Sequence, residues 1–245
     1  MEWTDPWLVP DRQEKVRDTC IFTWHLDALK VSLVDLNSFI PATEAKKLQQ
    51  STSVALRQKR TLSRVLLRAT LGAWVGGAPK ELTFIHGPYG KPYLQGGPAF
   101  NSSHSGPYFV MAIRPSGEVG VDIEMVRSTP DLTTIARSYF SPDEAAEIGA
   151  DPTDATEAFF RTWVRKEALL KGLGAGLSIA LHSFRVSSRV APVGTNVLIG
   201  SRTPAFEASA WTVSPLSAPP GAQAALAWND PDGYLDASNP EARGP

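Results

Sequence analysis

The sequence has little cysteine and no long apolar run. Cys20 is the one cysteine among 245 residues, so the chain cannot form an internal disulfide or a cysteine metal cluster. No stretch approaches the roughly 18 consecutive apolar residues of a membrane span, and residues 1–10 lack the basic and then apolar pattern of a signal peptide. We therefore expect a cytoplasmic protein that is stabilised by packing alone.

The composition excludes disordered and fibrous proteins. Hydrophobic residues make up 42% of the chain and charged residues 20%, with 24 Lys and Arg against 25 Asp and Glu. A chain of 245 residues with these proportions can form one large globular domain or two of roughly 120 residues, each with an apolar core.

Charge is unevenly distributed along the chain. Residues 46–68 contain seven basic side chains and no acid, whereas residues 118–157 contain ten acids and two bases. The first segment is suited to meet anions and the second to meet a cation. A solvated helix face is the simpler interpretation of either segment alone, but the two together favour a binding function.

Apolar periodicity predicts an α+β protein. The order strand, long helix, strands occurs twice, which suggests two halves of similar plan. A turn at 115–117 divides the chain into an N-terminal lobe at 1–116 and a C-terminal lobe at 117–228, and residues 229–245 are expected to form a mobile tail. The expected elements are strands at 20–26, 82–86, 107–113, 118–124, 183–190, 196–199, 206–213 and 222–228, and helices through 62–73, from 141 and at 153–171.

Glycines mark the expected ends of the two long helices. Gly72, Gly76 and Gly77 are expected to end the first long helix, and Gly172 and Gly174 are expected to end the second.

The strand at 20–26 alternates apolar and polar residues, so we expect one of its faces to be buried.

The strand at 118–124 carries the first chemical signal. Alternation places Val119, Val121 and Ile123 on one face and Gly120, Asp122 and Glu124 on the other. Two carboxylates side by side repel unless a cation lies between them, and a hard dication with oxygen ligands is the natural candidate. Two acids on a solvated strand face remain the simpler alternative.

The second long helix adds a third acid and a base. Trp163, Glu167 and Lys171 are spaced by four residues, so they share one helix face. An intrahelical ion pair between Glu167 and Lys171, worth about 0.3–0.5 kcal/mol, is the alternative to a functional role.

Residues 100–106 are rich in hydroxyl groups around a histidine. Ser103 next to His104 could suggest a serine hydrolase, but no G-x-S-x-G nucleophile elbow occurs in the chain. A phosphate-binding loop, in which hydroxyls and the imidazole donate to oxyanions, fits these residues better.

Four motifs in this order resemble those of the 4'-phosphopantetheinyl transferases, in the larger two-lobed type that activates peptide and polyketide synthases. They are Tyr89-Gly90-Lys91-Pro92, the run from Phe100 to Ser105, the run from Val119 to Glu124 and the run from Trp163 to Lys171. The resemblance covers about residues 40–190. It implies two similar α/β lobes related by a pseudo-twofold axis, each a small sheet with a long helix packed on it, and a cleft between them for coenzyme A and Mg2+.

The resemblance also implies roles for individual residues. Asp122, Glu124 and Glu167 would ligate Mg2+, and Glu167 would act as the base, directly or through a water. Lys171 would face the phosphates, so Asp122, Glu167 and Lys171 are the expected catalytic residues. The residues expected to bind coenzyme A are Lys46, Lys47, Lys59, Arg60, Lys91, Ser103, His104 and Lys171, with either Lys59 or Arg60 at the 3'-phosphate beside His104.

The implied reaction transfers 4'-phosphopantetheine from coenzyme A to a serine of an apo acyl or peptidyl carrier protein and releases 3',5'-adenosine bisphosphate. The enzyme would be a cytoplasmic monomer of secondary metabolite biosynthesis, with no nucleic-acid or membrane partner. Two alternatives are a non-catalytic regulator that binds coenzyme A or a nucleotide, and a Mg2+-dependent nucleotide hydrolase.

Overall fold

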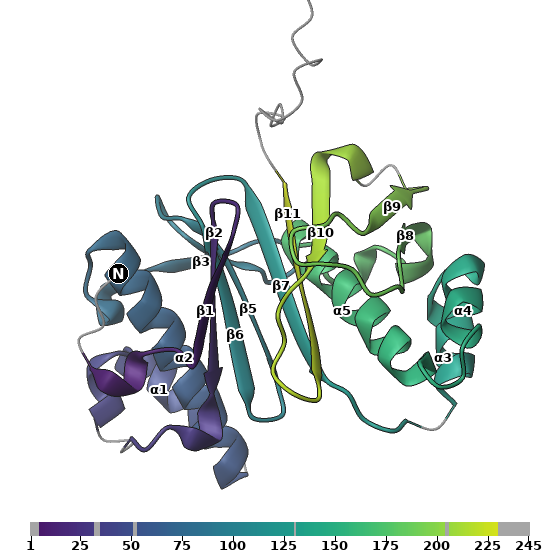
Figure 1. The fold of residues 1–245 in the computed structure, drawn as a ribbon. Coiled ribbons are helices and arrows are strands. Elements are labelled where there is room, and N and C mark those ends of the chain that lie inside the picture. Colours follow the sequence, from purple (N-terminus) through teal and green to yellow (C-terminus); the bar gives the residue numbers. More distant parts are fainter. Residues whose placement is uncertain (1–4, 32–34, 51–52, 130, 204–205, 230–245) are drawn as a thin grey trace, which may run out of the picture.

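The computed structural model describes residues 5–31, 35–50, 53–129, 131–203 and 206–229. Its strands form two larger sheets and two hairpins (Figure 1). The first sheet has the order β1-β2-β6-β5 and the second the order β10-β11-β7, with every pairing antiparallel. The strands are β1 (Arg12–Val16), β2 (Thr19–His25), β3 (Phe84–His86), β4 (Pro92–Leu94), β5 (Ala99–Ser105), β6 (Tyr108–Arg114), β7 (Glu118–Met125), β8 (Phe184–Val186), β9 (Leu198–Ser201), β10 (Trp211–Pro215) and β11 (Ala222–Asn229).

The two long helices are those that the sequence predicts. They are α2 (Val54–Val75) and α5 (Ala155–Leu173), and each ends at a glycine with positive φ, Gly76 at 69° and Gly174 at 62°. The shorter helices are α1 (Ala42–Leu48), α3 (Leu132–Tyr139) and α4 (Pro142–Gly149). Gly72 and Gly172 lie inside the helices, so the expectation that they end them was wrong.

Helix α2 packs on one face of the first sheet. Its apolar stripe of Leu62, Val65, Leu66 and Ala69 forms a core with side chains of the sheet such as Trp24, which is fully buried. Burying this stripe is the main source of stability for a helix with a polar outer face.

The opposite face of the first sheet packs on the second sheet. Ile21 of β2 shares a core with Val121 of β7 and with Trp228 of β11. Because Ile21 and Phe22 are both 1% exposed, β2 is buried on both faces, and the expectation of a half-buried strand was wrong. The second sheet covers the face of β2 that the alternation of apolar and polar residues assigns to solvent.

Helix α5 covers the outer face of the second sheet, which completes a helix, sheet, sheet, helix arrangement (Figure 1). Its core includes Val164 and Ala168 of the helix together with Val213 and Ala227 of the sheet. The α+β class is confirmed, while the pseudo-twofold relation and the two-lobe division stay predictions. No helix in the described ranges has both the length and the apolar character to span a membrane.

The beginning of α4 confirms a detail of the sequence. Ser141 caps the helix, its side chain and that of Glu144 forming a capping box, and Pro142 occupies the first turn. The expected mobile tail lies outside the described residues except for Asn229, which ends β11 and accepts a hydrogen bond from the backbone of Glu118.

Candidate functional site

The two larger sheets meet along β5 and β7. Hydrogen bonds between side chains of β5 and the backbone of β7 connect these two strands. Oδ1 of Asn101 accepts a hydrogen bond of 3.1 Å from the N–H of Val121, and Oγ of Ser105 accepts one of 3.0 Å from the N–H of Met125. Residues 99–105 form a strand that pairs with β6, so the expectation of a loop was wrong, while phosphate binding by this segment stays a prediction. Asn101, Ser103 and Ser105 lie on the face of β5 that bonds to β7.

Ser103, between those two residues, connects the seam to a cluster of charges. Its Oγ lies 2.7 Å from Oδ1 of Asp122 and 2.7 Å from Nζ of Lys171. Lys171 Nζ also lies 2.6 Å from the same Asp122 oxygen. Asp122 is 3% exposed, and its Oδ2 is buried without a hydrogen-bond partner among the described residues. A buried carboxylate oxygen without a donor is costly unless a ligand completes the site.

Lys171 reaches Asp122 because α5 lies directly against β7. A Cβ on Gly120 would lie 2.0 Å from the carbonyl oxygen of Ala168 and 2.2 Å from the nitrogen of Gly172. Only glycine permits this approach of the two backbones. Gly120 therefore sets the distance between the carboxylates of β7 and the side chains of α5.

A cavity of about 410 Å³ opens on this cluster. Its lining comes from β5, β7 and α5 and consists of Ser102, Ser103, His104, Asp122, Glu124, Trp163, Glu167 and Lys171. The structure thus brings together the three carboxylates and the lysine that the sequence singled out. The shared helix face of Trp163, Glu167 and Lys171 is confirmed, since all three line this cavity.

The carboxylates influence one another. Burial raises the pKa of Glu167, and the nearby charges of Asp122 and Glu124 raise it further while Lys171 opposes them. Glu124 accepts a hydrogen bond of 2.7 Å from Oγ of Ser105. Within the described ranges, no group of three or more His, Cys, Asp or Glu side chains has the arrangement of a metal site. The ammonium of Lys171 is the cation that contacts Asp122 in this structure.

A second cavity of about 320 Å³ adjoins the first and shares Ser102, Glu167 and Lys171 with it. Lys91 lines it from the β3–β4 hairpin but is only 8% exposed. Its Nζ forms an ion pair with Glu118 and donates to the carbonyl of Gly172 at 2.6 Å. Burial lowers the pKa of Lys91, and the Glu118 carboxylate opposes this shift. Lys91 is thus engaged in fastening the hairpin to the end of α5.

His104 lies on β5 at the rim of the first cavity. Burial lowers its pKa, followed by the positive charges of Lys171 and Arg60. Lys59 instead pairs with Asp27 at 3.1 Å and donates to the carbonyl of Gly106 at 3.1 Å. Of the two adjacent bases on α2, Arg60 is therefore the one whose charge acts on His104.

The other basic residues lie apart from this cluster or have protein partners. Lys46 and Lys47 are exposed in the last turn of α1 and line neither cavity. Arg64 and Arg68 of α2 both pair with Glu44 of α1. Part of the basic segment at 46–68 therefore joins two helices instead of meeting a ligand.

Sequence analysis missed the roles of Asn101 and Ser105 in holding β5 to β7. All five residues from Asn101 to Ser105 are polar, so the sequence carries no alternation that separates one strand face from the other. The buried face of this strand is polar because the neighbouring strand β7 supplies its hydrogen-bond partners.

Comparisons with known proteins agree with these motifs. The family model described as the 4'-phosphopantetheinyl transferase superfamily matches residues 118–227. A 4'-phosphopantetheinyl transferase of Bacillus subtilis is 33% identical over 173 residues, which cover 64% of this chain and 76% of that protein. The transferase HetI of a Nostoc species is 31% identical over 159 residues, which cover 62% of this chain and 67% of that protein.

Other relatives match over shorter segments. A Synechocystis protein of the same family is 33% identical over 131 residues, so the chain spans 53% of the length of that relative. The transferase Sfp of Bacillus subtilis strain 168 is 32% identical over 152 residues, 66% of its length. Together with the Bacillus protein matched over 76% of its length, these similarities show that the chain belongs to the 4'-phosphopantetheinyl transferase superfamily.

Proposed function

We propose that this chain transfers the 4'-phosphopantetheine group of coenzyme A to a serine hydroxyl of an apo acyl or peptidyl carrier protein. The reaction depends on Mg2+ and releases 3',5'-adenosine bisphosphate. The observation that carries this proposal is the cavity in which Asp122, Glu124, Glu167 and Lys171 meet.

The donor atoms of the cavity suit a hard dication. Asp122 offers a buried Oδ2 with no partner among the described residues. Burial raises the pKa of Glu167, and the charges of Asp122 and Glu124 raise it further, as expected where three carboxylates share one cavity. Asp122, Glu124 and Glu167 would hold Mg2+, which supplies positive charge to pyrophosphate oxygens.

Lys171 and Ser103 supply donors on the other side of Asp122. Their hydrogen bonds to Oδ1 hold both side chains at the cavity. Phosphoryl transfer requires alignment and neutralisation of charge more than covalent help, so the Lys171 ammonium would stabilise the phosphate oxygens in the transition state.

Glu167 would act as the base. Its carboxylate lines the cavity beside Asp122 and Lys171, and in the protein without metal burial and then the charge of Asp122 raise its pKa, which favours proton acceptance. The carrier serine oxygen forms a bond to the phosphorus that bears pantetheine, and its proton passes to Glu167 directly or through a water. The bond from that phosphorus to the bridging oxygen breaks, and 3',5'-adenosine bisphosphate leaves with the electron pair.

His104 and Arg60 would bind the 3'-phosphate. His104 lines the cavity, and its pKa is lowered by burial, then by the charge of Lys171 and then by that of Arg60, which supports placing Arg60 near the imidazole. Lys59 would act indirectly through its contact with Gly106, next to β5.

Incubation with coenzyme A, Mg2+ and a panel of apo acyl and peptidyl carrier proteins tests the proposal. Mass spectrometry should show one added phosphopantetheine on a carrier, and Glu167→Gln should abolish it. Binding of coenzyme A in calorimetry with every carrier unmodified would instead indicate a non-catalytic binding regulator. Release of product without any carrier would indicate a nucleotide hydrolase.

A further inference from the structure

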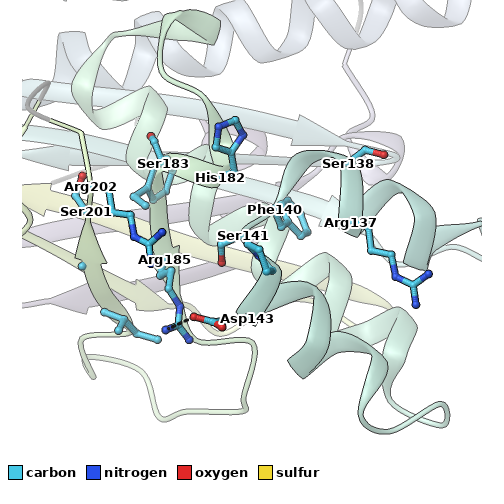
Figure 2. Close-up of a pocket in the computed structure, with 14 residues that line it drawn as sticks. Arg137, Ser138, Phe140, Ser141, Asp143, His182, Ser183, Arg185, Ser201 and Arg202 are labelled. Carbon is cyan, nitrogen blue, oxygen red and sulfur yellow. Dashed lines mark ion pairs between the residues drawn. The ribbon is translucent and has the colours of Figure 1, made fainter.

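A cavity of about 540 Å³ lies away from the candidate active site. It opens between α3 and α4 on one side and β8 and β9 on the other (Figure 2). It shares no lining residue with the two cavities described above. We name it the α4–β8 pocket, and its lining residues are Arg137, Ser138, Phe140, Ser141, Pro142, Asp143, His182, Ser183, Phe184, Arg185, Ile199, Gly200, Ser201 and Arg202.

The rim of the α4–β8 pocket is positively charged. Three arginines and His182 line it against a single carboxylate, that of Asp143. Asp143 is already paired, since its Oδ2 lies 2.8 Å from Arg185 (Figure 2). Arg137 and Arg202 have no carboxylate partner among the described residues. The pocket therefore has an excess of positive charge that the protein does not neutralise.

The floor of the pocket is apolar and rigid. Phe140 and Phe184 are 3% and 1% exposed and belong to the core beneath α5. Lys166 lies under them, with its Nζ 4.3 Å from the centre of the Phe184 ring and 2.6 Å from the carbonyl of that residue. On the rim, Ile199 is 53% exposed and adds an apolar wall.

We propose that the α4–β8 pocket binds a small amphipathic anion, with an aromatic or acyl body on Phe140 and Phe184 and a carboxylate, sulfonate or phosphate at Arg202 and Arg185. A small molecule fits because the volume of about 540 Å³ is that of a ligand pocket, and because an apolar floor with a few converging polar groups is typical of such sites. Arginine is suited to the anionic group since its planar fork matches the oxygens of these groups.

The serine hydroxyls beside the arginines already have backbone partners. Ser183 donates to the carbonyl of Ala180 at 2.7 Å, and Ser201 donates to the carbonyl of Thr203 at 3.4 Å and accepts from its N–H at 3.1 Å. The guanidinium groups are therefore the donors that would meet the oxygens of an anionic group.

Fluorescence titration of the full chain with anilinonaphthalene sulfonate tests this proposal. The probe should bind saturably, and Arg202→Gln should weaken it about tenfold or more, because a charge-assisted hydrogen bond is lost. Phenylnaphthylamine has the same rings without the sulfonate, and its affinity should be unchanged in this variant. Arg189→Gln is the matched control, since Arg189 is exposed in the same part of the chain but does not line the pocket.

Competition separates the pocket from the candidate active site. Saturating coenzyme A and the variant Lys171→Ala should both leave the affinity for anilinonaphthalene sulfonate unchanged. The proposal is overturned if Arg202→Gln binds this probe as the parent chain does, or if coenzyme A or Lys171→Ala removes the binding. None of these results depends on transfer to a carrier protein, so the outcome is independent of the proposed enzymatic function.

Discussion

Nζ of Lys171 lies 2.6 Å from Oδ1 of Asp122, while Oδ2 of the same carboxylate is buried without a partner among the described residues. The two oxygens of Asp122 therefore have different environments. Oδ1 accepts hydrogen bonds from Lys171 and Ser103, and Oδ2 accepts none among the described residues. Under the proposed function, this division would allow one side chain both to position the lysine of α5 and to bind a cation.

The three carboxylates should act as a unit. Asp122→Asn, Glu124→Gln and Glu167→Gln should each lower kcat by about a hundredfold or more, because each removes charge that the proposed reaction needs. Two changes together should cost far less than the product of the single effects. Steady-state kinetics at several Mg2+ concentrations measure the loss of kcat in the single variants and in the double variants. Glu157→Gln is the control, since Glu157 lies in the first turn of α5 and bonds Gln223. Near-normal rates in all three variants, with Mg2+ still required, would place the ligands elsewhere.

Gly120 should tolerate no side chain. Its Cβ would lie 2.0 Å from the backbone oxygen of Ala168, and neither backbone can move without separating α5 from β7. Gly120→Ala should therefore lower the free energy of unfolding by about 3 kcal/mol or more, and should also lower kcat as Lys171 is displaced from Asp122. Chemical denaturation and steady-state kinetics on one preparation measure the two effects.

Gly149 provides the matched control for that change. It is an exposed residue in the last turn of α4, and an added Cβ would meet nothing within 4 Å. Gly149→Ala should stabilise the protein by up to about 1 kcal/mol through helix propensity and leave the kinetics unchanged. Equal unfolding free energies for Gly120→Ala and the parent chain would show that α5 and β7 are not in close contact.

A buried ion pair holds α5 to α4 beneath the α4–β8 pocket. Nζ of Lys166 lies 2.8 Å from Oε1 of Glu144, and both side chains are fully buried. Burial lowers the pKa of Lys166 to about 8 against the opposing effect of Glu144, so the lysine is still protonated at pH 7. Lys166→Met should destabilise the protein by about 3–5 kcal/mol, because it leaves the Glu144 carboxylate buried without its cation.

Two further variants test the origin of that cost. Adding Glu144→Gln to Lys166→Met should recover part of the lost stability, since it removes the uncompensated charge while an amide oxygen can still accept hydrogen bonds. Arg185→Gln breaks the partly exposed pair with Asp143 and should cost less than about 1 kcal/mol. Thermal and denaturant unfolding compare the series. A double variant less stable than Lys166→Met would contradict the charge argument.

The carboxylate strand could be predicted from the sequence because its buried face is apolar. Val119, Val121 and Ile123 are each at most 1% exposed, so simple alternation places Asp122 on the opposite face, as the structure has it. The same method failed for β5, since the face of Asn101 and Ser103 is buried against polar groups of β7. Hydrophobic periodicity detects burial in an apolar core and cannot detect a hydrogen-bonded seam.

The basic residues show a second limit of sequence reasoning. Lys59 and Lys91 match positions where phosphate ligands are expected, yet each contacts a carboxylate distant in the chain, Asp27 and Glu118. Whether a cation is free for a ligand depends on long-range partners that a motif does not specify. Of the adjacent bases Lys59 and Arg60, it takes the tertiary structure to identify Arg60 as the one whose charge lowers the pKa of His104.

The preference for coenzyme A over dephospho-coenzyme A should depend on pH through His104. The pKa of this imidazole lies below the ordinary value of 6.5 in the free protein, because burial and then the charges of Lys171 and Arg60 disfavour its protonated form. A bound 3'-phosphate would favour protonation and raise the pKa. The preference should therefore be greatest below the pKa of the free protein and decline as pH rises through the pKa of the complex. His104→Gln should remove this dependence, and Arg60→Gln should reduce the preference at every pH. Calorimetric Kd values for both coenzymes from pH 5 to 8 measure the ratio. If the ratio is independent of pH in the parent chain and unchanged in both variants, His104 and Arg60 do not bind the 3'-phosphate.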